Sequence, residues 1–142
     1  MKKNIIFIVT LFFTIIVIIT YTIYNSNKIE KESAQNNKPY ESFLEQQVLG
    51  TDVISIINKA IDNNEKNAVE KDEKGNYIEN DTDSIIIKIK FKELDKIITM
   101  ESIERQGIQA FKKNFRAFGF KCTKIEYHPK TKNVKLMYFE QL

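Results

Sequence analysis

The stretch IIFIVTLFFTIIVIITYTIY, residues 5–24, decides the organisation of this chain. It contains no charged residue, and nearly every position is Ile, Val, Leu, Phe, Thr or Tyr. A helix of this length spans about 30 Å, the hydrocarbon thickness of a bilayer. The stretch therefore predicts a transmembrane anchor. The residues expected to hold it in the membrane include Ile5, Ile8, Leu11, Phe12, Ile15, Ile19 and Tyr24.

A cleaved secretion signal and a buried globular helix are the two alternatives to a retained anchor. The apolar core of a secretion signal is shorter, about 7–15 residues, and ends at a small-x-small cleavage site. The best pair here is Thr20 and Thr22, which is a poor site. No cysteine lies near the stretch, which excludes a lipoprotein-type cleavage. A retained anchor is therefore the favoured interpretation.

Basic residues on the two flanks of the stretch predict its orientation. Lys2 and Lys3 stand close to its amino-terminal end, whereas Lys28 and Lys31 lie further from the other end. Basic residues are enriched on the cytoplasmic side of membrane spans. We therefore expect a single-pass protein of the cell membrane with its amino terminus in the cytoplasm and its main domain outside.

The remainder of the chain divides into a short polar segment and one domain. Residues 25–39 are polar, of mixed charge and without an apolar period, and they predict a tether. Residues 40–142 have the length of one small domain. The chain has 22 basic and 19 acidic residues, and without Lys2 and Lys3 the counts are 20 and 19. This balance argues against a nucleic-acid partner.

One cysteine, Cys122, excludes an intramolecular disulfide. Domains from oxidising compartments often contain cysteine pairs. An outside domain without them fits a Gram-positive envelope better than an endoplasmic reticulum route.

Two helices are expected in the domain. In TDVISIINKAIDNN, residues 51–64, the apolar residues recur with helical spacing, with Thr51 as N-cap and Asn63–Asn64 as the stop. Residues 99–118 form the second helix, with Gly107 on its apolar side and Gly119 as a left-handed C-cap. A helical turn is also expected within residues 43–48. The stripe of the first helix consists of Val53, Ile56, Ile57, Ala60 and Ile61.

Alternating apolar and polar residues predict the strands. The clearest strand is 84–92, followed by a short one at Ile97–Ile98, and a hairpin joins 121–127 to 134–140. Gly75 is expected in a tight turn that joins two short strands, one at Val69 and one at residues 77–78. The fold class is therefore α+β: a transmembrane helix followed by a small domain of two helices packed on an antiparallel sheet.

Residues that carry chemistry are few and scattered. His128 is the only histidine, expected to be exposed in the hairpin turn, and Cys122 is expected on a strand face shared with Lys124 and Glu126. Acidic residues in a turn-rich segment suit turns better than a calcium loop, because their spacing lacks the EF-hand pattern. We expect no catalytic, cofactor-binding or metal-ligating residues, and no enzyme. The acidic residues are Asp72, Glu73, Glu79, Asp81 and Asp83.

The stretch VLGTDVISIINKAIDNNEKN, residues 48–67, together with the preceding anchor and the GNYI turn, resembles a group of small bacterial proteins. These are single-pass, signal-anchored proteins of low-GC Gram-positive bacteria, in which a Gly-x-Asp-Val-Ile-Ser-type helix start follows the anchor. The resemblance implies a location and an architecture, and it implies no activity.

The chain also resembles type IV pilins and pseudopilins in the order of its parts, an apolar amino-terminal helix before an α+β domain. It departs from them in having no Glu near the start of residues 5–24 and no Gly before an aromatic residue or Met at a cleavage point. We therefore expect a non-enzymatic envelope protein that binds or scaffolds another envelope protein. A pilin-like subunit and an immunity or regulatory protein are the alternatives.

Self-association within the membrane is a further alternative. Thr10 and Thr14 lie four residues apart and offer a small-residue contact between helices, so a homo-oligomer stays possible.

Overall fold

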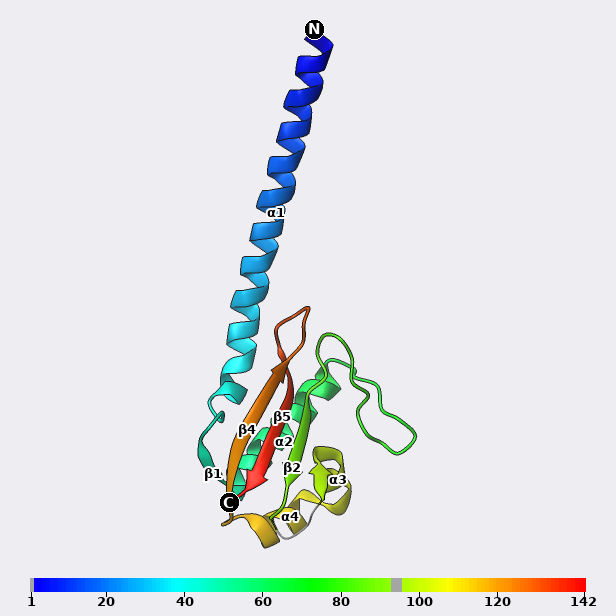
Figure 1. Cartoon of the computed structure of the whole chain (residues 1–142). Helices are drawn as coiled ribbons and strands as arrows, with labels where there is room; N and C mark the ends of the chain where they lie inside the picture. The colour runs from blue at the N-terminus through cyan, green and yellow to red at the C-terminus, as the bar shows by residue number, and fades with distance from the viewer. Residues whose placement is uncertain (1, 93–95) are drawn as a thin grey trace.

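The computed structural model describes residues 2–92 and 96–142. A long helix, α1, spans Lys2–Glu41 and stands out from a head that contains the remaining elements (Figure 1). The head is α+β, as expected from the sequence, and the carboxyl end of the chain lies at the end of the head that is far from the amino terminus (Figure 1).

The apolar part of α1 has no partner within the described residues. Its large apolar side chains from Ile5 to Tyr24 are 41–69% exposed. Exposure of such a surface to water is unfavourable, and large exposed apolar areas are normally covered by a partner or a membrane. Among the described residues, α1 is the one helix that is long and apolar enough to cross a bilayer.

The polar segment 25–39, expected as a tether, is helical and continues the apolar part without a break. Ser33, Asn37 and Tyr40 are buried where the last turns of α1 meet the head. Pro39 lies within this last part, and its missing N–H leaves the carbonyl of Gln35 without the usual helical donor. The segment is thus a helical stalk fixed to the head.

Within the described ranges, five strands form one mixed sheet in the order β1-β4-β5-β2-β3. The expected sheet was antiparallel, but β2 and β5 run parallel, with Ile86 opposite Leu136. The other described pairs are antiparallel. Local patterns cannot reveal this pairing, because the two strands are far apart in the chain. The strands are β1 (Gln47–Leu49), β2 (Ile86–Lys90), β3 (Ile97–Thr99), β4 (Gly119–Tyr127) and β5 (Val134–Gln141).

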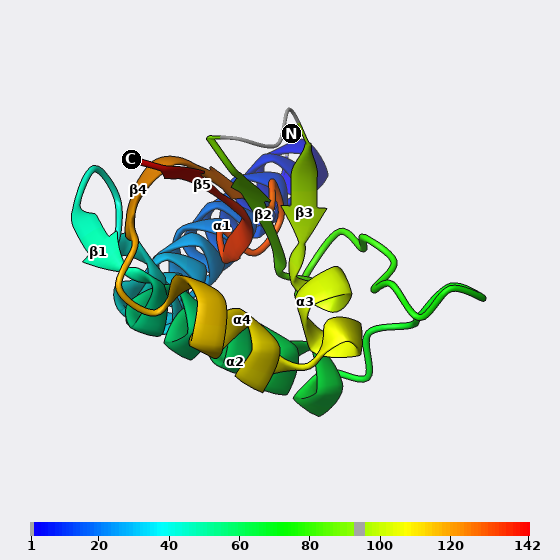
Figure 2. The same cartoon turned by 90° about the horizontal axis from the view of Figure 1, so that it is seen from below.

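Three helices in the described part of the head cover one face of the sheet. They are α2 (Gly50–Lys66), α3 (Met100–Gln106) and α4 (Ile108–Phe115). Figure 2 shows α2 and α4 side by side against the sheet, with α3 next to α4. The predicted stripe of α2 is confirmed, because all five of its residues are buried. The alternation predicted for residues 84–92 is confirmed as well, because Ile87 and Ile89 in β2 and the flanking Ile85 and Phe91 are buried.

The ends of α2 differ from the prediction. The helix begins at Gly50, so its N-cap residue is Leu49 and not Thr51, and the Asp52 carboxylate accepts the N–H of Leu49 at 2.9 Å. Asn64 does not stop the helix, which continues to Lys66. The side chain of Asn64 is buried and forms hydrogen bonds with the backbone of Ile85. Asn64 therefore makes a tertiary contact instead of ending the helix.

The expected second helix, 99–118, is two helices that break at Gly107. This glycine adopts φ +90°, a conformation that residues with a Cβ rarely adopt, and it therefore does not belong to a continuous apolar face. Gly119 was expected as a left-handed C-cap, but its φ is not positive and it begins β4.

Three further predictions of local structure were wrong. The chain at residues 43–48 leaves the helical conformation, and Gln47 and Val48 belong to β1, which pairs with β4. In β4 the register shifts between Cys122 and Lys124, so the simple alternation of faces fails there. Around Gly75 the structure has a turn and a single bridge between Lys71 and Tyr77 in place of two strands.

Candidate functional site

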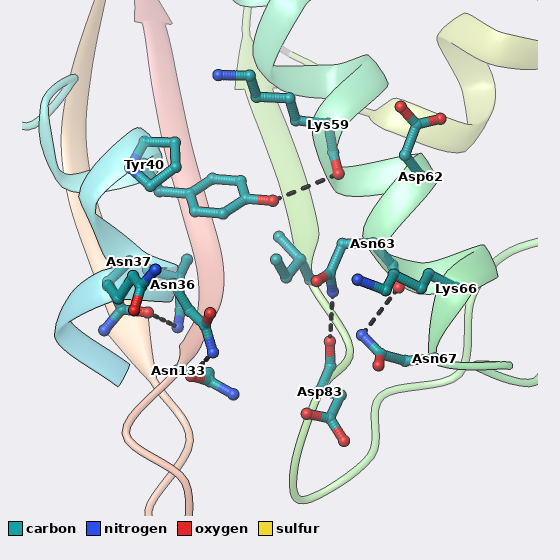
Figure 3. Close-up of a pocket in the computed structure, with 14 residues that line it drawn as sticks. Asn36, Asn37, Tyr40, Lys59, Asp62, Asn63, Lys66, Asn67, Asp83 and Asn133 are labelled. Atoms are coloured by element: carbon teal, nitrogen blue, oxygen red, sulfur yellow. Dashed lines mark hydrogen bonds between the residues drawn. The ribbon is translucent and has the colours of Figure 1, made fainter. Parts of the chain in front are cut away.

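A polar cleft lies where the stalk meets the head. Its volume is about 520 Å³, within the range of small-ligand sites. Four segments line it: the end of α1, the carboxyl-terminal half of α2, the chain entering β2 and the chain entering β5. Figure 3 shows these segments as two walls, with Asn36, Asn37, Tyr40 and Asn133 on one side and the α2 residues on the other.

The first wall is built around Asn37, which is buried at the end of α1. Its amide nitrogen donates to the carbonyl of Lys132 at 2.8 Å, and its oxygen accepts the N–H of Val134 at 2.8 Å. The side chain thus occupies the place of a neighbouring strand and fixes α1 to the start of β5. Beside it, Asn36 donates to Asn133 at 3.4 Å.

Tyr40 joins the first wall to the second. Its hydroxyl donates to the carbonyl of Lys59 in α2 at 3.3 Å, while the ring is buried. Burial, with a further contribution from the negative charge of Asp62, raises the pKa of Tyr40 to about 12. The hydroxyl therefore stays a neutral donor over the physiological range and holds α1 against α2.

The second wall is one side of α2. Asn63 donates to the carbonyl of Asp83 at 2.9 Å, and Asn67 donates to the carbonyl of Asn63 at 2.9 Å. Lys59, Asp62 and Lys66 also line the cleft, and they form no ion pair within the described part of the chain. In Figure 3 the ammonium of Lys66 points towards the space between the walls.

The floor of the cleft depends on a network at the start of β2. Asn64 in α2 donates to the Ile85 carbonyl and accepts the Ile85 N–H, both at 2.8 Å. Asn80 accepts the backbone N–H groups of three successive residues that end at Ser84. Ser84 in turn offers its carbonyl to Nε2 of His128 at 2.8 Å. These bonds hold the two parallel strands β2 and β5 where they begin beneath the cleft.

His128 is therefore not the exposed turn residue that its position next to Pro129 suggested. It is 1% exposed, and because a carbonyl accepts hydrogen bonds, Nε2 carries the proton. Its Nδ1 is buried and has no hydrogen-bond partner among the described residues. The residue supports the turn between β4 and β5 and fixes it to the chain before β2.

Cys122 lies in the core and not at a reactive surface. It is fully buried, and burial raises the pKa of its thiol, which disfavours the thiolate that a nucleophile needs. Cys122 pairs with Phe139 and is buried, whereas Lys124, beyond the register shift, is exposed, so the two residues do not share a strand face as expected. His128 stands six positions further along the chain, roughly 20 Å away in extended backbone. The structure does not bring the two residues together.

The acidic residues of 72–83 serve separate local roles. Asp72 accepts the N–H groups of Lys74 and Asn76, and the hydrogen bonds from Asn76 lower the pKa of its carboxyl group. Asp81 pairs with Lys130 at 2.7 Å. No group of three His, Cys, Asp or Glu side chains within the described ranges is arranged to hold a metal ion.

Comparisons of this chain with protein-family models, with curated proteins and with solved structures found no match.

Sequence reasoning missed the cleft. Its lining residues are spread from Gln35 to Val134, and half of them are Asn or Lys, which are frequent throughout this chain. One available signal was the pair Asn63–Asn64 inside a strongly periodic helix. A polar residue such as Asn64, next to the apolar stripe, points to a buried hydrogen-bonding role.

Proposed function

We propose that this protein is a non-enzymatic, membrane-anchored protein whose head binds another protein of the cell envelope. The observation that carries the proposal is α1: one helix holds an exposed apolar half and a polar half fixed to a folded head. A domain attached in this way is presented at a constant distance from the bilayer. The likeness to single-pass proteins of low-GC Gram-positive bacteria is part of the same proposal.

The geometry of the head supports a binding role. Cys122 is buried in its neutral form, and His128 is engaged with Ser84. The cleft gathers hydrogen-bonding groups at the junction of stalk and head, about 16 Å of helix beyond Tyr24. Preformed clefts with a few convergent polar groups are the usual place for a ligand.

The proposed orientation puts the amino terminus in the cytoplasm and the head outside. It is tested with a maleimide reagent that cannot cross membranes, in a Cys122→Ala background. We expect Asn27→Cys to react in intact cells and Asn4→Cys to react only after lysis. The reverse pattern would place the head in the cytoplasm.

The binding role is tested by purifying the full-length protein from solubilised membranes after brief chemical cross-linking. We expect one envelope protein to be recovered repeatedly with the whole chain and not with a control of residues 1–41. Recovery of the protein alone and monomeric in every preparation would contradict the proposal.

A pilin-like subunit is the second candidate, and one observation favours it. The apolar half of α1 projects from the head as the continuation of a single 40-residue helix, the shape from which helical bundles of subunits are built. This candidate predicts processing near the amino terminus and polymers in sheared cell fractions. An intact mass confined to membranes would exclude it.

A further inference from the structure

The groups in the cleft that internal contacts leave available are of both charges and of both hydrogen-bonding kinds. Lys59 and Lys66 carry positive charge, and Asp62 and Asp83 carry negative charge. A purely anionic ligand would meet two carboxylates, and a purely cationic ligand would meet two ammonium groups, so either would be disfavoured. The ligand that matches this lining carries both charges.

The charges on α2 follow a regular order. Lys59, Asp62 and Lys66 are spaced three and four residues apart, and residues at this spacing are neighbours on one side of a helix, about 5–6 Å apart between Cβ atoms. The result is a row of positive, negative and positive groups along one wall. In an extended peptide, side chains two residues apart lie on the same side and about 7 Å from each other. The spacing of the charges along α2 is therefore compatible with the spacing of alternate side chains in an extended peptide.

The opposite wall provides carboxamides, which suit a peptide backbone. A carboxamide both donates and accepts hydrogen bonds. Two carboxamides in this protein already bond backbone groups: Asn37 bonds the carbonyl of Lys132 and the N–H of Val134, and Asn64 bonds the carbonyl and the N–H of Ile85. Gln35 and Asn36 lie exposed on the cleft wall beside Asn37. By contrast, the one aromatic residue of the lining, Tyr40, is 7% exposed and offers no open ring for a sugar to stack on.

We propose that the cleft binds an extended peptide segment with an acidic and a basic side chain two residues apart. The inference rests on the proposed function, since it names the part of the partner protein that the head recognises. The acidic side chain lies near Lys66 or Lys59, and the basic one lies near Asp62. The exposed carboxamides of Gln35 and Asn36 bond the peptide backbone.

The test measures binding of synthetic peptides to the full-length protein in detergent micelles by titration calorimetry. The probe is Ala-Glu-Ala-Lys-Ala, capped at both ends. Its matched control, capped Ala-Glu-Lys-Ala-Ala, has the same composition but directs the two charges to opposite sides. We expect the probe to bind about threefold to fivefold more tightly than the control, as for an exposed charge pair.

Variants of the protein locate the binding. Asp62→Asn and Lys66→Gln are each expected to weaken the binding of the probe about threefold to fivefold. Glu70→Gln and Lys113→Gln, exposed charges away from the cleft, serve as matched controls and are expected to leave it unchanged. Equal binding of probe and control peptide, no binding of either, or tighter binding of an N-acetylglucosamine tetramer would each overturn the inference.

The failures of the two proposals are distinguishable. If cross-linking recovers a partner with wild type and equally with Asp62→Asn and Lys66→Gln, the cleft inference is wrong and the binding role stands. If the peptide binds as expected but no partner is ever recovered, the cleft inference stands and the proposed function is wrong.

Discussion

Gly50 shows how closely two helices approach in the head. A Cβ at this position would lie 2.1 Å from the carbonyl oxygen of Phe115 at the end of α4, a distance that no packing tolerates. Because the obstacle is backbone, α2 and α4 would have to separate. The glycine at the start of the Gly-x-Asp-Val-Ile-Ser stretch is therefore a packing requirement as well as a helix start.

Gly50→Ala is expected to lower the free energy of unfolding by about 2 kcal/mol or more, as overpacking against rigid neighbours does. Gly119→Ala is the matched control, since its Cβ would meet only the flexible side chain of Leu142 at 3.4 Å. Its effect should stay within about 0.5 kcal/mol. Urea unfolding of the solubilised full chain, followed by near-ultraviolet circular dichroism, measures both variants, and equal midpoints would contradict the packing argument.

Asn64→Ala removes both partners of the Ile85 backbone and leaves a buried N–H and a buried carbonyl without hydrogen bonds. We expect a loss of about 2–4 kcal/mol in the free energy of unfolding. Asn58→Ala, an exposed position on the same helix, is expected to have no destabilising effect. A loss of stability for Asn64→Ala no larger than for Asn58→Ala would mean that the bonds to Ile85 contribute little.

Tyr40 gives the protein a dependence on alkaline pH. Its folded pKa of about 12 lies above the ordinary value of 10.0, so its contribution to stability is complete below pH 10 and is lost as the pH rises towards 12. Tyr77 and Tyr127 shift in the same direction, because burial raises the pKa of each. The test therefore compares wild type with Tyr40→Phe. Between pH 9 and pH 11.5 the unfolding midpoint should fall further in wild type, and parallel curves would contradict the assignment.

Sequence patterns predicted the burial of individual residues where the neighbours were local. Val53 and Ile57 follow from helical spacing, and Ile87 and Ile89 follow from strand alternation. His128 was predicted wrongly, because its burial depends on Ser84, which lies 44 positions away in the chain. A turn position next to proline carries no information about such a partner.

At the scale of elements, α1 is the least expected feature. Its residues 25–39 have no apolar period, and they are helical because the preceding apolar part of α1 nucleates the helix and the head holds its other end. Tyr127 adds a bond from β4 to Glu41 at 3.0 Å. The stalk thus depends on its two ends more than on its own composition.

Glu30→Pro is expected to break the stalk, because proline removes a helical hydrogen bond and clashes with the preceding turn. Spin labels at Asn27→Cys and Ser55→Cys, in a Cys122→Ala background, measure the result as a distance distribution. We expect a narrow distribution with Glu30→Ala and a broad one with Glu30→Pro, while the unfolding midpoint of the head stays the same. Equally broad distributions in both variants would show that the stalk is not a rigid helix.

Prediction of the other elements succeeded where periodicity is strong and failed where a single residue or a distant partner decides. The helix α2, the strand β2 and the hairpin of β4 and β5 follow from the sequence. The break at Gly107 was hidden, because a glycine within an apolar pattern fits both a helix face and a helix end. The cleft was hidden for another reason: it exists only when four segments meet.

At the scale of the whole molecule, β5 organises the sheet. It lies between β4 and β2, and through β2 it also holds β3. Its core-facing side chains include Met137 and Phe139, and these two residues are fully buried. Removal of this strand would separate the sheet into two pieces, each with an exposed edge.

A chain that ends after Lys132 is therefore expected to lose cooperative unfolding altogether, since paired strands without a third neighbour are marginally stable in water. Near-ultraviolet circular dichroism and amide hydrogen exchange of the solubilised protein measure this. A cooperative transition and protected amides in residues 86–90 of the shortened chain would contradict the central role of β5.

The parallel pairing of β2 with β5 affects the order in which the chain folds. Ile86 finds Leu136 only after the intervening chain is present, so formation of the sheet is a late, non-local step. On the proposed topology, the chain emerges from the membrane with α2 and β2 first. These segments are present before β5, their neighbour in the sheet. In that interval a chaperone at the outer surface could bind them, or they could associate wrongly with another chain.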